Sequence, residues 1–285
     1  MSLKIVECPR DAMQGLHTFI DTDVKISYIN QLLKVGFDTI DFGSFVSPKA
    51  IPQMKDTREV LAGLDLSATT SKLLAIVANA RGAEEACGHP EIAYLGYPFS
   101  ISETFQQRNT NASIADSLAR TAEIQELCLK HNKTMVVYIS MAFGNPYGDA
   151  YSPEIALKWS EKLAGELGIK VIALSDTIGS ATPELISDLF ASLIPALPGV
   201  EIGAHLHSVP YQVHEKVKAA YDAGCRRFDG ALKGFGGCPM AKDDLTGNMN
   251  TELMIDWFAQ NNVDTGLNHS ELQNSLLMAS ATFPG

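Results

Sequence analysis

The segment IKVIALSDTIGSATPELISDLFASLIPALPGVEIGAHLH, residues 169–207, contains two short apolar runs separated by an amphipathic stretch. The runs at 171–176 and 201–207 have the length and apolar content of buried strands. Between them, Thr182-Pro183 begins a stretch with apolar residues three and four positions apart, which is typical of a helix with proline at its first position. The segment therefore predicts a β–α–β unit of a parallel sheet.

The same alternation continues along the whole chain. Strands are predicted at residues 4–8, 39–43, 64–68, 92–97, 135–142, 171–176, 201–207 and 227–232. Helices are predicted at residues 24–35, 113–131, 153–167, 183–196, 213–223 and 252–260. A (β/α)8 TIM barrel typically takes ~250 residues, so we expect an α/β fold in which residues 1–285 form a single barrel domain. Its active site should lie at the C-terminal ends of the strands.

The composition disfavours several classes of protein. The net charge of −11 disfavours nucleic acid as a partner, because its binders cluster Lys and Arg against phosphates. No apolar run approaches the ~20 residues that span a bilayer, and residues 1–10 lack the apolar stretch of a signal peptide. The five cysteines lack CxxC spacing, which disfavours a disulfide scaffold and a zinc knuckle. We expect a cytoplasmic protein without nucleic-acid or membrane contacts.

Two histidines give the sharpest local signal for chemistry. His205 and His207 lie two positions apart at the end of a predicted strand, so both imidazoles should face the barrel axis. They are candidate metal ligands, or polar residues hydrogen-bonded in the barrel mouth. Arg10 and Asp11 follow the first predicted strand and would bring a cation and a carboxylate to the same end of the barrel. They could also form a surface ion pair.

A glycine-rich stretch follows the last predicted strand and ends in Cys238-Pro239. Such a loop can approach a ligand closely, and the thiol of Cys238 could serve as an acid or base. The loop could also cradle a phosphate or be a simple turn. Asn248 offers a neutral oxygen ligand. Together with a carboxylate and two imidazoles it would favour Mg²⁺ or Mn²⁺ over structural zinc.

Two further carboxylates, Asp41 and Asp176, lie at predicted strand ends. Either could orient a metal ligand or take a proton, and either could instead cap the following helix.

Together these residues resemble the 3-hydroxy-3-methylglutaryl-CoA lyase family, within the larger group of barrel metalloenzymes that includes isopropylmalate and homocitrate synthases. The resemblance extends through nearly the whole chain. It rests on Pro9-Arg10-Asp11 with Gln14, Ser44-Phe45-Val46-Ser47-Pro48-Lys49, Asp176-Thr177-Ile178-Gly179, His205-Leu206-His207 and Gly236-Gly237-Cys238-Pro239. The Ser-Phe-Val-Ser-Pro-Lys and Gly-Gly-Cys-Pro motifs separate this lyase from the synthases.

The resemblance implies an acyl-CoA substrate that is cleaved to acetyl-CoA and acetoacetate. It implies roles for the following residues: Asp11, His205, His207 and Asn248 as ligands of a divalent metal, Arg10 in stabilising the enolate, Cys238 in proton transfer, and Asp41, Asp176, Gln14 and Glu252 in support. Many barrels form homodimers, and the apolar segment 272–283 could pack on the barrel or on a second subunit.

The chain also departs from the family's pattern. The family usually has Asp-Thr-Tyr-Gly after the second histidine, whereas this chain has Ser208-Val209-Pro210-Tyr211. A usual lysine is His17, a usual glutamate is Asp41, and Lys233 stands where a small residue is usual. These departures leave three alternatives open: a lyase for a related 3-hydroxyacyl-CoA, a Schiff-base aldolase that uses Lys233, and a barrel that binds CoA esters without turnover.

Overall fold

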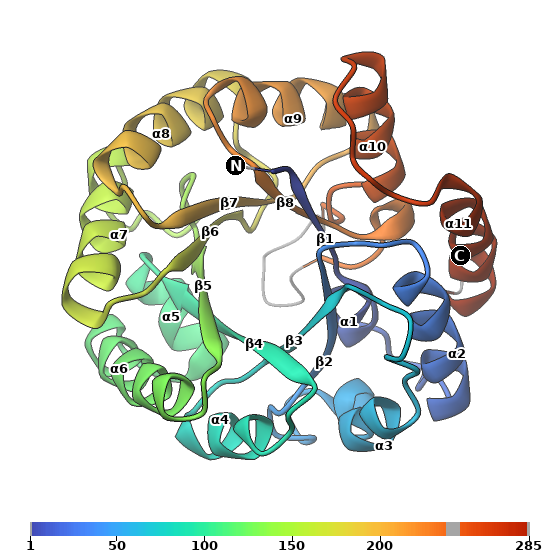
Figure 1. Ribbon diagram of the computed structural model, residues 1–285. Helices are drawn as coiled ribbons and strands as arrows, with labels where there is room; N and C mark the ends of the chain where they lie inside the picture. The colour runs from blue at the N-terminus through green and yellow to red at the C-terminus, as the bar shows by residue number, and fades with distance from the viewer. Residues whose placement is uncertain (1, 238–245, 284–285) are drawn as a thin grey trace.

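The computed structural model describes residues 2–237 and 246–283. Within these residues, eight parallel strands form a closed barrel in chain order, and the last strand pairs with the first. Helices surround the strands on the outside (Figure 1). The prediction of a single-domain (β/α)8 barrel is confirmed.

The elements have the following bounds. The strands are β1 Lys4–Glu7, β2 Thr39–Ser44, β3 Lys72–Ile76, β4 Ile92–Ser100, β5 Thr134–Ser140, β6 Val171–Asp176, β7 Glu201–Leu206 and β8 Arg227–Gly230. The helices are α1 Pro9–Gln14, α2 Thr22–Leu33, α3 Thr57–Ala62, α4 Ala80–Cys87, α5 Glu103–Thr110, α6 Ile114–Lys130, α7 Pro153–Leu167, α8 Pro183–Ala196, α9 Val213–Asp222, α10 Thr251–Gln260 and α11 His269–Thr282.

The prediction was wrong for the position of the third strand. It was predicted at residues 64–68 but lies at Lys72–Ile76. Residues 64–68 alternate apolar and polar side chains, as a half-buried strand does. Asp65 instead accepts hydrogen bonds from the backbone and hydroxyl of Ser67, which closes a local turn. Leu73 and Leu74, which lie five to ten residues further along the chain, are fully buried in the observed strand.

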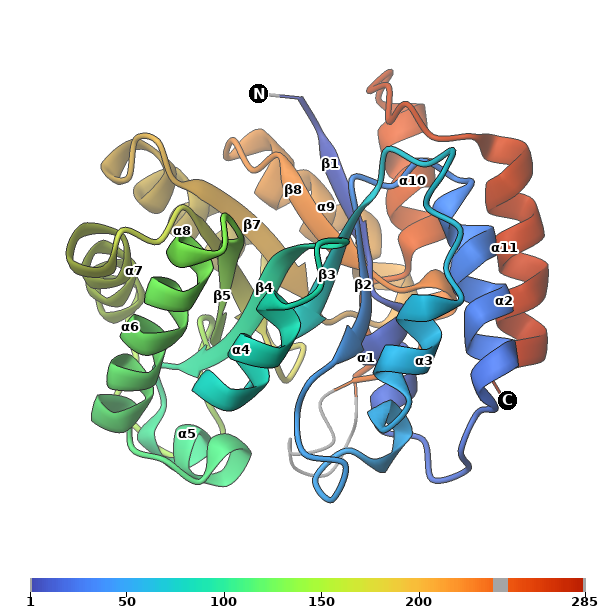
Figure 2. The same ribbon diagram turned by 60° about the horizontal axis from the view of Figure 1, so that its bottom comes forward.

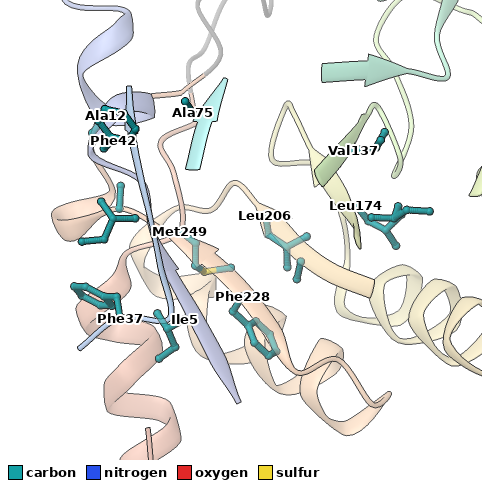
Figure 3. Packing of buried hydrophobic residues seen from close by; sticks show 14 of the residues in the cluster. Ile5, Ala12, Phe37, Phe42, Ala75, Val137, Leu174, Leu206, Phe228 and Met249 are labelled. Carbon is teal, nitrogen blue, oxygen red and sulfur yellow. The ribbon is translucent and has the colours of Figure 1, made fainter. Parts of the chain in front are cut away.

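Apolar side chains pack on both faces of the barrel wall. Residues such as Ile5, Leu174 and Phe228 belong to the cluster between strands and helices (Figure 3). A smaller cluster fills one side of the interior and consists of Leu74, Ile76, Tyr94, Val136, Tyr138, Val171 and Ala173. Ala204 and Leu206 belong to the apolar cluster between strands and helices. Because side chains alternate along a strand, the neighbouring histidines face the interior, as predicted.

The C-terminal helix packs on the barrel. In Figures 1 and 2, α11 lies beside α2. The rings of Tyr28 and Phe283 meet edge to face at 5.6 Å, and Gln31 donates a hydrogen bond to Glu271. This contact covers part of the apolar segment that was expected to pack on the barrel or on a second subunit. Among the described residues, no helix is long and apolar enough to cross a membrane.

Candidate active site

One carboxylate and two imidazoles meet at the C-terminal end of the strands. Asp11 lies on α1, which begins directly after β1 with Pro9 at its first position. His205 and His207 come from the end of β7. The ligand atoms of Asp11, His205 and His207 all lie within 4.8 Å of one another. We call these three residues the outer cluster.

Each histidine is oriented through its Nδ1 atom. Nδ1 of His205 lies 3.2 Å from Oδ2 of Asp229, and Nδ1 of His207 lies 3.1 Å from the carbonyl oxygen of Thr246. Histidines that bind metals usually donate the other ring N–H to a carboxylate or a carbonyl. The Nε2 atoms of both rings are then available as ligands.

The protonation states of Asp11 and His207 suit a divalent cation, whereas burial is outweighed at His205 by Asp229 and Asp11, which raise the pKa of that imidazole. Burial, assisted by His205, lowers the pKa of His207 to about 4, so His207 is a neutral imidazole at pH 7. Burial favours a higher pKa for Asp11, but Arg10 and both histidines outweigh burial and lower that pKa. An ionised carboxylate and a neutral imidazole therefore face one another, which is a donor set that fits a divalent metal.

Asn248 lies beside the outer cluster. Its backbone forms an antiparallel bridge with His207, and its buried side chain donates a hydrogen bond from Nδ2 to the Phe235 carbonyl at 2.9 Å. A hydrogen bond from Asn248 also lowers the pKa of Asp11. The predicted fourth ligand is thus brought next to two of the other predicted ligands.

The glycine-rich stretch packs closely against α1. Gly236 has a φ of +91°, and a Cβ atom at this position would lie 2.7 Å from the backbone oxygen of Asp11 and 2.8 Å from Cα of Ala12. Only glycine fits both the backbone conformation and the space. Cys238, the predicted acid or base, lies outside the described residues.

Arg10 is held by two carboxylates and an amide. Its Nη2 lies 2.6 Å from Asp41 Oδ2 and its Nη1 lies 3.1 Å from Asp11. Nη1 also donates to Gln14 at 2.7 Å, and Gln14 in turn donates to Asp11. Burial raises the pKa of Asp41 to about 6 although Arg10 opposes the shift. The network fixes the guanidinium at one wall of the pocket.

The outer cluster and Arg10 line an open pocket of about 160 Å³. Its polar lining residues include Arg10, Asp11, Gln14, Ser140, Ser175, Thr177, His205 and His207, and its apolar lining residues include Val46, Ile51, Ile76, Ala78, Pro98 and Phe105. The pocket therefore suits a substrate that carries both polar and apolar groups.

Two of the predicted supporting residues hold backbone groups near the site in place. Asp176 pairs with Lys216 at 3.0 Å, and Lys216 also donates to the carbonyl of His207 at 2.9 Å. Glu252 accepts a hydrogen bond from the backbone N–H of Lys233 at 2.8 Å, at the start of the glycine-rich stretch. These contacts position the ligand-bearing segments.

The sequence analysis missed the role of Asp229 and of Lys216. Asp229 follows Arg227 at a spacing of two in a fully buried strand, which is the pattern that identified the histidines, so it could have been found. Lys216 lies on α9 among other charged residues, and no sequence signal separates it from them.

The comparisons with known proteins agree with this geometry. Residues 3–277 match the family model described as HMGL-like. The chain is 33% identical over 273 residues to the mitochondrial hydroxymethylglutaryl-CoA lyase of Mus musculus, covering 95% of this chain and 82% of the relative. It is 34% identical over 266 residues to the hydroxymethylglutaryl-CoA lyase YngG of Bacillus subtilis, covering 93% and 87%.

A solved structure extends the likeness to three dimensions. The structure of an HMG-CoA lyase from Acinetobacter baumannii in complex with coenzyme A and 3-methylmalate is 31% identical, with a TM-score of 0.90, over 99% of this chain and 91% of that chain. The family model and the relatives thus span nearly the whole barrel, including all three residues of the outer cluster. The chain belongs to the HMGL-like family.

Proposed function

We propose that this protein is a metal-dependent carbon–carbon lyase that cleaves 3-hydroxy-3-methylglutaryl-CoA to acetyl-CoA and acetoacetate. The family and the names of its relatives support the activity, and a relative solved with coenzyme A supports an acyl-CoA substrate. The observation that carries the proposal is the outer cluster, which faces the same pocket as Arg10.

Asp11, His205, His207 and Asn248 would hold the metal, with Mg²⁺ or Mn²⁺ favoured by the mixed nitrogen and oxygen donors. A divalent metal in this site supplies Lewis acidity, which makes a coordinated hydroxyl easier to deprotonate. The contacts of both Nδ1 atoms support this assignment, because they leave Nε2 of each ring for the metal.

Arg10 would stabilise the negative charge that develops on the thioester oxygen when the carbon–carbon bond breaks. Its guanidinium is already fixed by Asp41 and Asp11, so little reorganisation is needed during the reaction. Asp41 would act by holding Arg10, and Asp176 by holding Lys216 against the His207 backbone. Cys238 would take part in proton transfer from the glycine-rich loop.

A related 3-hydroxyacyl-CoA is the second candidate substrate. The segment after His207 carries no acidic group, because Ser208-Val209-Pro210 takes its place. The hydroxyl of Ser208 donates to the Val209 carbonyl at 2.9 Å and is therefore engaged within the segment. This change near the outer cluster favours a substrate whose acyl group differs there.

A Schiff-base aldolase is less well supported. That chemistry needs a lysine that is desolvated in a pocket, whereas the side chain of Lys233 is exposed. The buried Lys25 and Lys216 are paired with Asp56 and Asp176. No lysine is found among the described residues that line the pocket.

The proposal includes a reducing compartment such as the cytoplasm. Cys8, Cys87, Cys128 and Cys225 are unpaired thiols, which suits such a compartment. We also propose that the protein forms a homodimer. The exposed Leu277 on α11 is the first residue to test as part of its interface. Light scattering of the wild type and Leu277→Glu would test that contact.

The test of the activity is acetoacetate release from 3-hydroxy-3-methylglutaryl-CoA, with Mn²⁺ or Mg²⁺ compared with EDTA. Asp11→Ala and His205→Ala should lose bound metal together with activity. Cys238→Ser should keep the metal and lose most turnover. Full activity in metal-free Asp11→Ala protein would disprove the metal mechanism. If the wild type holds metal but releases no acetoacetate, the related substrate becomes the better assignment.

A further inference from the structure

A second group of metal-ligating side chains lies next to the outer cluster. The ligand atoms of Cys8, His205 and Asp229 are within 4.8 Å of one another. The three residues come from adjacent positions in the barrel wall: His205 is paired with Asp229 across β7 and β8, and the backbone N–H of Cys8 donates to the Gly230 carbonyl. We call these residues the inner cluster.

Polar atoms of the inner cluster lack normal hydrogen bonds to the described residues. Asp229 is 2% exposed, and its Oδ1 has no hydrogen-bond partner among the described residues. Arg227 Nε lies 3.9 Å from that oxygen, which is too far for a hydrogen bond. Cys8 is 1% exposed, and its thiol makes a long contact of 3.9 Å to the Val6 carbonyl. A buried carboxylate oxygen without a donor is costly.

We propose that Cys8, His205 and Asp229 form a second cation site, which takes a thiophilic divalent ion of the zinc class. Sulfur, imidazole nitrogen and carboxylate oxygen are the three ligand types that zinc combines in proteins. A thiolate also gives the inner cluster a preference that the outer cluster lacks, because soft sulfur ligands do not suit Mg²⁺ or Mn²⁺. The ion would bind Asp229 through Oδ1, which has no hydrogen-bond partner among the described residues, or through Oδ2.

The shared histidine links the two clusters. Nδ1 of His205 faces Asp229, so Nδ1 is the atom that would bind the inner ion. A neutral imidazole has one nitrogen with a free lone pair. When Nδ1 binds the ion, the ring proton moves to Nε2 and the thiol proton of Cys8 leaves to solvent. Nε2 is then a donor and cannot bind a metal in the outer cluster.

The two ions therefore exclude one another. A thiophilic ion in the inner cluster removes His205 from the outer cluster and inhibits the proposed lyase, and excess Mn²⁺ reverses the inhibition. The binding step stands on the geometry of the inner cluster, whereas the inhibition rests on the proposed function. The two steps need separate measurements.

Cobalt spectroscopy tests the binding step without any activity. Co²⁺ bound by a thiolate gives a sulfur-to-cobalt charge-transfer band in the near ultraviolet, and nitrogen and oxygen ligands give none. Metal-free wild type, Asp11→Asn and Cys238→Ser should all show the band after Co²⁺ is added. Cys8→Ser and Cys8→Ala should lose it, whereas Cys225→Ser, which removes another buried thiol, should keep it.

A band that survives both substitutions of Cys8 overturns the proposal, as does a wild type without the band. Loss of the band in Cys238→Ser assigns the thiolate to the loop and also overturns it. Circular dichroism of each variant shows whether the barrel is intact, and Cys8→Ala provides a second variant if the serine hydroxyl is not tolerated in the core.

Zinc inhibition tests the link to the outer cluster. Zn²⁺ titrated into the Mn²⁺-loaded enzyme should inhibit acetoacetate release, and the half-inhibiting concentration should rise with Mn²⁺. Cys8→Ala should require at least about tenfold more Zn²⁺, the factor that corresponds to the loss of about 1.4 kcal/mol of binding. Equal sensitivity of Cys8→Ala and wild type would overturn the exclusion. If neither releases acetoacetate, the proposed function fails while the cobalt result still decides the binding site.

Discussion

The two ends of the barrel both contain buried charges, but they arrange them differently. At the N-terminal end, Glu201 pairs with Lys4 and with Arg227, whose Nη1 is 3.3 Å away. The nearby cavity is about 30 Å³. These cations and carboxylates largely neutralise one another, so this end has little capacity to bind a further ion.

At the C-terminal end, Arg10 is engaged mainly by Asp41, and the carboxylate of Asp11 also faces two imidazoles. This arrangement opens to the larger pocket. The comparison teaches that buried charge alone does not identify a site. A cation site has more carboxylates and imidazoles than the neighbouring Lys and Arg side chains can pair with. It also lies where a substrate can reach it.

Removing one carboxylate from each end of the barrel should give the largest difference between the two ends, in turnover at one end and in stability at the other. Asp11→Asn should lower kcat by roughly 10²- to 10³-fold, as removal of a preorganised electrostatic group commonly does, with a small change in Tm. Glu201→Gln should leave kcat within about threefold, and it should destabilise the fold by about 1–3 kcal/mol because Arg227 then lacks its nearest carboxylate. The measurements are steady-state kinetics and thermal unfolding.

The comparison breaks down if Glu201→Gln lowers kcat as much as Asp11→Asn does. Arg10→Lys and Arg227→Lys provide a matched check, because both guanidinium groups are buried among carboxylates. The change at Arg10 should affect mainly turnover, and the change at Arg227 mainly stability.

Glu7 sharpens the comparison because it is a buried carboxyl group that faces neither a cation nor the pocket. It accepts hydrogen bonds from Thr251 Oγ1 at 2.6 Å and from the Leu232 N–H at 2.8 Å, and burial raises its pKa from 4.5 to about 8. The folded protein keeps this proton in a pH range where the unfolded chain has lost it. The contribution to stability is therefore full below about pH 4.5 and is lost as the pH rises to about 8.

Within that window this group should lower the free energy of unfolding by about 1.4 kcal/mol per pH unit. Glu7→Gln stays neutral, so its stability relative to wild type should rise between pH 5 and pH 8. Denaturant unfolding at several pH values measures the difference. Glu123→Gln, at an exposed position on α6, is the control and should follow the wild type. Parallel curves for Glu7→Gln and wild type would show that Glu7 ionises normally.

The sequence predicted what depends on local pattern. The alternation of strands and helices predicted the barrel, and the rule that parallel strands end at one edge predicted that His205, Asp11 and Arg10 lie together. Residues 64–68 were misassigned because their apolar alternation competes with a turn that Asp65 closes with its own side chain. Alternation alone does not reveal such a turn.

The partners of the site residues could not be predicted, because they depend on tertiary packing. Asp229 faces His205 through the register of β7 and β8, and the Thr246 carbonyl reaches His207 from a segment 39 residues away. Lys216 reaches Asp176 from the helix after the next strand. No pattern in the sequence encodes these distances. They determine which ring nitrogens are free, and therefore what the site can bind.

The smallest effect concerns backbone strain at the C-terminal end. Among the described residues, Met141 and Lys233 are the non-glycine residues other than asparagine with positive φ, at 60° and 62°, and both follow strands at this end. A left-handed conformation costs an ordinary residue ~1–2 kcal/mol, and glycine avoids that cost but loses ~0.5–1 kcal/mol of entropy on folding. Lys233→Gly should therefore stabilise the protein by up to about 1 kcal/mol.

Lys218→Gly is the matched control, because Lys218 is an exposed lysine in the regular helix α9. This change should destabilise the protein by about 1 kcal/mol. Opposite signs for the two substitutions in urea unfolding would assign the effect at Lys233 to its backbone. If both substitutions destabilise equally, the backbone at Lys233 carries no strain that glycine relieves. The C-terminal end would then differ from the N-terminal end in its charges and not in its backbone.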